Sequence, residues 1–154
     1  MDRIFDLCVP RGDVVSGEIG KSDFAADLAQ VIKETAPEEY RVARLFFANT
    51  YPTRGLKSLL ANVCARLSAR PGEVAAIFRL GTSFGGGKTH SLIALVHAAR
   101  GMQGVANAAE FIDSSLLPNR RVRVAAFDGE NADPANGRNM GEGVLAYTPW
   151  GEIA

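Results

Sequence analysis

The residues of this chain best suited to hold phosphate lie together in one glycine-rich stretch, residues 82–90 (TSFGGGKTH). Glycines let the backbone curl so that successive N–H groups face an anion. Lys88 can then place its ammonium beside the outer phosphates of a nucleotide, and the Thr89 hydroxyl is of the type that ligates Mg²⁺ in such loops. The residues that this pattern predicts for binding ATP and Mg²⁺ are Gly85, Gly86, Gly87, Lys88, Thr89 and His90, with Thr89 as the metal ligand.

The stretch departs from the strict phosphate-loop pattern G-x-x-x-x-G-K-[ST] at its first position, which falls on Thr82. We expect the phosphate loop to tolerate this threonine. The leading glycine forms the turn out of the preceding strand and does not bind phosphate, and Gly81 can form that turn instead. His90 could help to fix the base of the loop. His97 is expected on a helix face and has no assigned role.

A phosphate loop needs a strand that leads into it and a helix that leads out of it. Residues 74–80 (VAAIFRL) form a short apolar run between turn residues, which favours a buried strand of a parallel sheet. Residues 91–100 carry apolar side chains at helical spacing and end before Gly101, a suitable C-cap. Residues 121–127 (RVRVAAF) are expected as the next strand, which completes one βαβ unit.

The fold class that follows is α/β, with part of a P-loop NTPase parallel sheet preceded by an α-helical N-terminal segment. Residues 1–72 are the helical lead-in, in which Ser22 caps one helix and an apolar stripe marks a second helix over residues 56–70. Residues 73–154 are the N-terminal part of the nucleotide-binding domain. Pro149 stands where a further helix would begin, and the sequence ends shortly afterwards at Ala154. We therefore expect a truncated domain of a longer protein.

P-loop ATPases also use an acidic residue at the end of a neighbouring strand to hold the Mg²⁺ water shell. Asp128 ends the expected strand 121–127 and is the candidate for this catalytic role. Glu130 is not adjacent to it, whereas a paired Asp-Glu is the usual ATPase form, so an acid beyond Ala154 is the alternative. Residues 128–143 are rich in Gly, Asn and Asp and are expected to form a loop.

Composition excludes several classes of protein. The 17 Asp and Glu residues balance 17 Lys and Arg residues, so no overall field favours nucleic acid or an anionic membrane. The N-terminus lacks the apolar region of a secretory signal, and no apolar run is long enough to span a bilayer. Cys8 and Cys64 have neither metal-ligand nor disulfide spacing and are expected to be buried. We therefore expect no membrane association and a reducing cytoplasm as the compartment.

Several stretches resemble a family of large bacterial and archaeal ATP-binding proteins catalogued as domain of unknown function 499. They are the FGGGKTH loop and residues 24–28 (FAADL), 127–129 (FDG), 141–143 (GEG) and 150–153 (WGEI). The resemblance implies an AAA-like P-loop protein with its phosphate-binding loop on residues 85–89, and its members commonly carry a polar residue at the first position of the strict pattern. Members are much longer than this chain, which implies the remainder of a longer polypeptide, or a partner chain, as its partner. They are often encoded near DNA methyltransferases and phage-defence systems, which implies a DNA-linked setting and an indirect association with DNA.

Two functions remain open at this point. In the first, the chain is the Mg-ATP-binding segment of an AAA-like ATPase and hydrolyses ATP only as part of a longer chain. In the second, it is a non-hydrolysing interaction module, whose helices over residues 24–32 and 56–67 dock onto another chain while the loop binds phosphate weakly. A small-molecule kinase is disfavoured because no lid-like arginine cluster follows the loop. Solvated strand flanks are expected at Arg120, Arg121 and Arg123.

Overall fold

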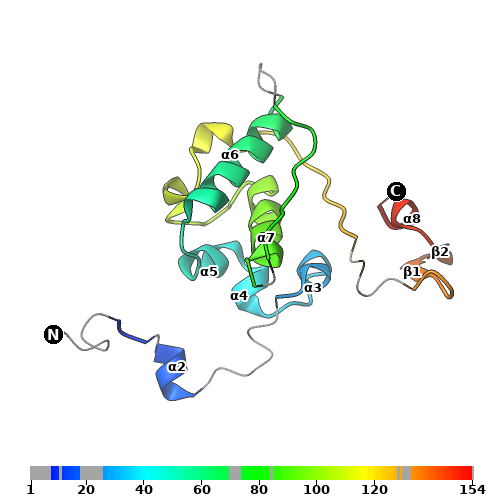
Figure 1. The fold of residues 1–154 in the computed structure, drawn as a ribbon, viewed down its shortest axis with the longest axis horizontal. Helices are drawn as coiled ribbons and strands as arrows, with labels where there is room; N and C mark the ends of the chain where they lie inside the picture. Colours follow the sequence, from blue (N-terminus) through cyan, green and yellow to red (C-terminus); the bar gives the residue numbers. More distant parts are fainter. Residues whose placement is uncertain are drawn as a thin grey trace.

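The computed structural model describes residues 8–10, 12–17, 26–69, 74–83, 85–127, 129 and 133–153, and this part of the chain is mainly helical (Figure 1). The α-helices are α2 (Gly12–Ser16), α3 (Leu28–Ile32), α4 (Glu38–Arg41), α5 (Ala43–Ala48), α6 (Arg54–Leu67), α7 (Lys88–Ala99) and α8 (Pro149–Ile153). Two short 3₁₀ helices, η2 (Ala108–Glu110) and η3 (Ser114–Leu116), follow α7, and two strands, β1 (Arg138–Gly141) and β2 (Val144–Ala146), precede α8.

Helix α6 confirms the predicted second helix and shows where its apolar stripe goes. Thr53 caps its first turn, with the hydroxyl accepting a hydrogen bond from the Leu56 N–H at 3.2 Å. Leu56, Leu60 and Cys64 recur at helical spacing and are all buried in the chain's own core. The part of the stripe formed by these three residues is therefore not free to dock onto another protein, whereas Val63 and Leu67 on the same helix are half-buried and line a gap beside α7.

Helix α3 is shorter than the sequence predicts. It begins after Asp27, whose carboxylate accepts hydrogen bonds from the N–H groups of Ala29 (2.8 Å) and Gln30 (3.2 Å). The predicted cap, Ser22, lies outside the described residues. The helix ends at Ile32, and Glu34 has a positive φ of 60°, which a continuing helix does not allow.

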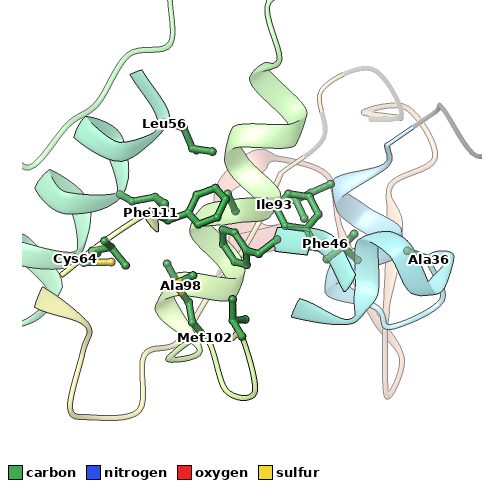
Figure 2. Close-up of a cluster of buried hydrophobic side chains, with 14 residues drawn as sticks. Ala36, Phe46, Leu56, Cys64, Ile93, Ala98, Met102 and Phe111 are labelled. Atoms are coloured by element: carbon green, nitrogen blue, oxygen red, sulfur yellow. The ribbon is translucent and has the colours of Figure 1, made fainter. Parts of the chain in front are cut away.

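The hydrophobic core lies between α5, α6 and α7 (Figure 2). Phe46 comes from α5, Cys64 from α6 and Ile93 from α7, while Phe111 closes the core from the segment after α7. Because α7 shares this core with α5 and α6, the glycine loop that precedes α7 is anchored to the helical lead-in. The domain boundary at residue 72 stays a prediction, and helices from both sides of it pack together.

The two cysteines differ in their surroundings. Cys64 is fully buried, as predicted, and burial raises the pKa of its thiol to about 11. Cys8 is exposed, so the prediction that it is buried is wrong. Its neighbours in the sequence, Val9 and Pro10, are also exposed, which shows that its local segment joins no apolar core.

The two segments predicted to be strands, residues 74–80 and 121–127, are extended but carry no ladder of hydrogen bonds. In the second segment Val122 and Val124 are half-buried, whereas Arg121 and Arg123 are exposed, which is the alternation of a strand. Within the described ranges, no backbone hydrogen bond joins either segment to another strand. Both segments start near the C-terminal end of α6 and run downward in Figure 1. The parallel sheet therefore stays a prediction.

The only strand pair in the described part is antiparallel and lies within and just after residues 128–143, where the sequence predicted a loop. Strands β1 and β2 are joined by Glu142 and Gly143, with φ of 50° and 79°. Two consecutive residues with positive φ form the tight turn that suits a two-residue hairpin. The prediction of a loop up to residue 143 is thus wrong from Arg138 onward, because this turn pairs the two flanking segments.

Helix α8 begins at Pro149, as predicted. The Thr148 hydroxyl accepts a hydrogen bond from the Gly151 N–H at 3.2 Å, as an N-cap does. The Arg138 guanidinium forms a salt bridge of 2.7 Å with Glu152, whose side chain is only 5% exposed, and this pair joins α8 to β1.

None of the helices in the described residues combines the length and the apolar character needed to cross a membrane.

Candidate functional site

The glycine loop has a backbone that only glycine adopts easily. Gly85 and Gly87 have φ values of 77° and 72°, in the left-handed region that strains other residues. The Gly86 N–H donates a hydrogen bond to the Ser83 carbonyl at 3.1 Å and closes a turn between them. A Cβ atom on Gly86 would lie 2.5 Å from the Thr82 Oγ1 atom, so the threonine that replaces the usual leading glycine is accommodated by a glycine opposite it.

Helix α7 begins directly after this turn and leaves several N–H groups without a partner. Gly87 occupies the N-cap position and has no side chain to cap the first turn. In the part of the chain that the structure describes, the backbone N–H groups that donate no hydrogen bond include those of Gly85, Gly87, Lys88, Thr89 and His90. Together with the partial positive charge of a helix N-terminus, these donors can hold an anion.

The Lys88 side chain folds back over the loop that precedes it. Its ammonium donates hydrogen bonds to the carbonyls of Thr82 (3.0 Å) and Ser83 (2.9 Å). These two contacts hold a positive charge beside the unpaired N–H groups and brace the start of the loop. An anion bound by those N–H groups would therefore lie close to the ammonium.

Of the two residues predicted to act on Mg²⁺, the structure describes Thr89 but not Asp128. Thr89 is half-buried in the first turn of α7, and its hydroxyl makes no hydrogen bond to any described residue. It is therefore available as a ligand. Asp128 lies outside the described residues, so its catalytic role stays a prediction. Within the described ranges no cluster of three or more His, Cys, Asp and Glu could hold a metal, and Mg²⁺ in phosphate sites typically relies on one or two protein ligands plus phosphate oxygens.

His90 directs its ring away from the loop and into the helical lead-in. Its Nε2 atom lies 2.9 Å from the Thr50 hydroxyl, which in turn donates a hydrogen bond to the Phe46 carbonyl at 2.6 Å. The hydroxyl proton is therefore engaged, so His90 must donate from Nε2. The ring also stacks on Phe46, with centroids 4.4 Å apart, and burial lowers the pKa of His90. Of His90, only the backbone N–H belongs to the loop; the side chain fixes the first turn of α7 to α5.

His97 makes a second tie of the same kind, which the sequence analysis missed. It is 3% exposed, and its Nε2 atom donates to the Tyr40 carbonyl at 2.8 Å. Burial lowers its pKa, the hydrogen bond to Tyr40 raises it, and the nearby Arg100 charge lowers it, for a net lowering. The available signal was the spacing: His90 and His97 are two helical turns apart and so lie on one face of α7.

Comparison with known proteins identifies the family. A family model described as DUF499 N-terminal domain matches residues 10–137, which contain the glycine loop and both histidines. No curated protein and no solved structure matches the chain. On the match over most of its length, the chain belongs to the DUF499 family and carries that family's N-terminal domain.

Proposed function

We propose that the chain binds ATP with Mg²⁺ through residues 82–90, as a segment of an AAA-like P-loop ATPase that works in a DNA-modification or phage-defence setting in the cytoplasm. The observation that carries the proposal is the coincidence of three features at one place. They are the left-handed backbone at Gly85 and Gly87, the unpaired N–H groups at the start of α7, and the ammonium of Lys88. A glycine turn with a purely structural role requires neither unpaired N–H groups nor a lysine ammonium beside it.

The division of labour in such a site follows from the chemistry of each group. The N–H groups at the start of α7 would hold the inner phosphates, and Lys88 would neutralise the outer ones. The Thr89 hydroxyl would ligate Mg²⁺, which supplies charge neutralisation between the outer phosphates. Hydrolysis requires an acid near this ion, for which Asp128 is the candidate in this chain.

The surroundings of α7 support a P-loop sheet beside it. Leu92 on α7 is 38% exposed, although the helix is apolar around most of its circumference. Such helices are normally covered on all sides. A gap of about 260 Å³ separates apolar side chains of α6 and α7, including Leu67 and Leu95, from Val122 and Val124. Pairing of residues 74–80 and 121–127 with further strands, from the remainder of a longer polypeptide or from a partner chain, would form the AAA-like sheet and cover this face.

Isothermal titration calorimetry with Mg-ATP tests the proposal. Lys88→Ala removes the ammonium and its contacts with the carbonyls of Thr82 and Ser83, so we expect at least a tenfold loss of affinity, or about 1.4 kcal/mol. Lys57→Ala is the matched control, because Lys57 is an exposed lysine on α6. Wild-type protein that takes up no ATP, or two variants that bind ATP equally well, would refute nucleotide binding at the loop.

A further inference from the structure

A second positively charged site lies at the opposite end of α7 from the glycine loop. There, a hollow of about 1260 Å³ is lined by four arginines together with the side-chain amides of Gln103 and Asn119. We call it the arginine hollow; its arginines are Arg100, Arg120, Arg121 and Arg123. Its described lining includes neither Asp nor Glu. In a chain whose charges balance overall, this is a marked local excess of positive charge.

The charges of the four arginines are not neutralised by close acidic partners among the described residues. The Arg120 guanidinium donates a hydrogen bond to the Leu67 carbonyl at the end of α6, at 3.0 Å. Arg121 and Arg123 are exposed and make neither a hydrogen bond nor an ion pair with any described residue. Arg100 lies 3.9 Å from Glu34, but both side chains are well exposed, at 40% and 70%, and an exposed pair at that distance neutralises little.

The alternation of residues 121–127 aligns two of these charges. Val122 and Val124 are half-buried, whereas Arg121 and Arg123 are exposed, so the two arginines lie on the same, more exposed face of the extended segment. Two guanidinium groups on one face of an extended chain form a short row. That row is suited to a ligand with repeated negative charge.

The hollow is separate from the nucleotide loop. Helix α7 has 12 residues, which at about 1.5 Å per residue places its two ends about 18 Å apart. The helix dipole disfavours anions at a C-terminus, but here three of the last four carbonyls of α7 accept hydrogen bonds. The carbonyls of Val96, His97 and Ala98 accept hydrogen bonds from the N–H groups of Arg100, Met102 and Gly101. The arginine side chains therefore dominate the local charge.

We propose that the arginine hollow binds the phosphodiester backbone of a nucleic acid. Guanidinium groups match phosphate oxygens in a two-point geometry, and the amides of Gln103 and Asn119 can add neutral hydrogen bonds. The hollow exceeds the roughly 300–1,000 Å³ of a small-molecule site, which favours a section of a polymer. Its described lining has no aromatic residue on which bases could stack, so binding is independent of base sequence. It also lacks the aromatic anchors typical of a peptide-binding surface.

Fluorescence anisotropy without ATP tests this proposal independently of the nucleotide loop. The probes are a labelled oligothymidylate and a labelled duplex, titrated with the full chain between about 50 and 200 mM salt. We expect Arg121→Gln with Arg123→Gln to weaken binding of at least one probe about tenfold at the low-salt end. A plot of log K against log salt has a negative slope, and the same double variant should make that slope shallower by about two. Comparing the two probes shows whether a single strand or a duplex is preferred.

The matched control carries the same change in net charge elsewhere. Arg44→Gln with Arg54→Gln replaces two exposed arginines on α5 and α6 that line no part of the hollow. Equal weakening by both double variants would show that the attraction is diffuse and would overturn the proposal. So would failure of the wild type to bind either probe at low salt. Polyglutamate that displaces the probe as well as unlabelled oligothymidylate does would also overturn it, because the hollow would then select acidic chains in general. Melting curves verify that the variants fold.

Discussion

The two ends of α7 attract anions by different means. At the N-terminal end the backbone itself supplies the donors, because Gly87 leaves the first turn uncapped and the helix dipole is favourable. At the C-terminal end three of the last four backbone carbonyls accept hydrogen bonds, and Arg100 with the neighbouring arginines supplies the charge. The first arrangement suits one compact polyphosphate in a fixed position. The second suits a longer ligand that needs charge but little geometric precision.

The same helix is also held differently along its length. His90 and His97 lie on one face of α7, and both rings contact Phe46. His90 also bonds to the Thr50 hydroxyl, and His97 bonds to the Tyr40 carbonyl. His90 ties the turn that carries Lys88 and Thr89, whereas His97 ties the turn before the arginine hollow. Residues 38–50 therefore form a common support for both ends.

Gly86→Ala should produce the largest change, and only at the N-terminal end. The added Cβ would meet the Thr82 side chain at 2.5 Å, so the loop must shift, and we expect ATP affinity to fall about ten- to a hundredfold. Calorimetry measures this loss. Thr82→Gly in the same protein removes the two closest contacts, leaves the Ser83 carbonyl at 3.0 Å, and should restore part of the binding. Gly55→Ala is the control, since an added Cβ there meets nothing within 4 Å. Unchanged affinity in Gly86→Ala would contradict the assigned loop geometry.

Thr50→Val tests the support beneath the loop. The change removes the acceptor of the His90 Nε2–H and leaves that donor without a partner in a partly buried place. We expect the free energy of unfolding to fall by about 1–3 kcal/mol in urea denaturation.

Replacing His90 as well shows whether the loss in Thr50→Val arises through the ring. His90→Phe keeps the stacking on Phe46 and removes the stranded donor, so the double variant should lose less than the sum of the two single variants. Strict additivity of the two losses would show that the hydroxyl and the ring do not act together.

Stability should fall in mild acid because both histidines are held neutral. The pKa values of both histidines are lowered in the folded state, so the unfolded chain binds more protons as the pH drops below about 6.5, the pKa of an unperturbed histidine. The stabilisation is complete above that pH and is lost below it, by at most about 1.4 kcal/mol per pH unit for each histidine. Urea denaturation between pH 7 and pH 5 measures the slope. His97→Gln should reduce it, and an unchanged slope in that variant would show that His97 does not contribute.

Glu34→Gln should have the smallest effect, and only at the C-terminal end. It removes the carboxylate 3.9 Å from Arg100, so we expect nucleic acid to bind up to about twofold more tightly, with ATP affinity unchanged. Anisotropy and calorimetry on one preparation compare the two ends directly. A change in ATP affinity of similar size would show that the ends of α7 are not independent.

Sequence reasoning was strongest where the signal is local. The helix that follows the glycine loop, the α6 helix and the burial of Cys64 follow from spacing and composition, and all are confirmed. It was weakest at Cys8 and in the hairpin after Arg138. The exposure of Cys8 depends on whether its segment finds a core to join, and the hairpin depends on one turn that pairs two strands of only four and three residues.

The sequence by itself determined that residues 82–90 form a glycine turn that leads into a helix, because torsion preferences and helical periodicity act over a few residues. Only the tertiary structure decided that His90 reaches Thr50 and that His97 reaches Tyr40, 40 and 57 positions away. It alone also brought Arg100 beside Arg120 and Arg123. Such contacts depend on how helices pack, and no spacing within a single element specifies which distant residue will lie opposite it.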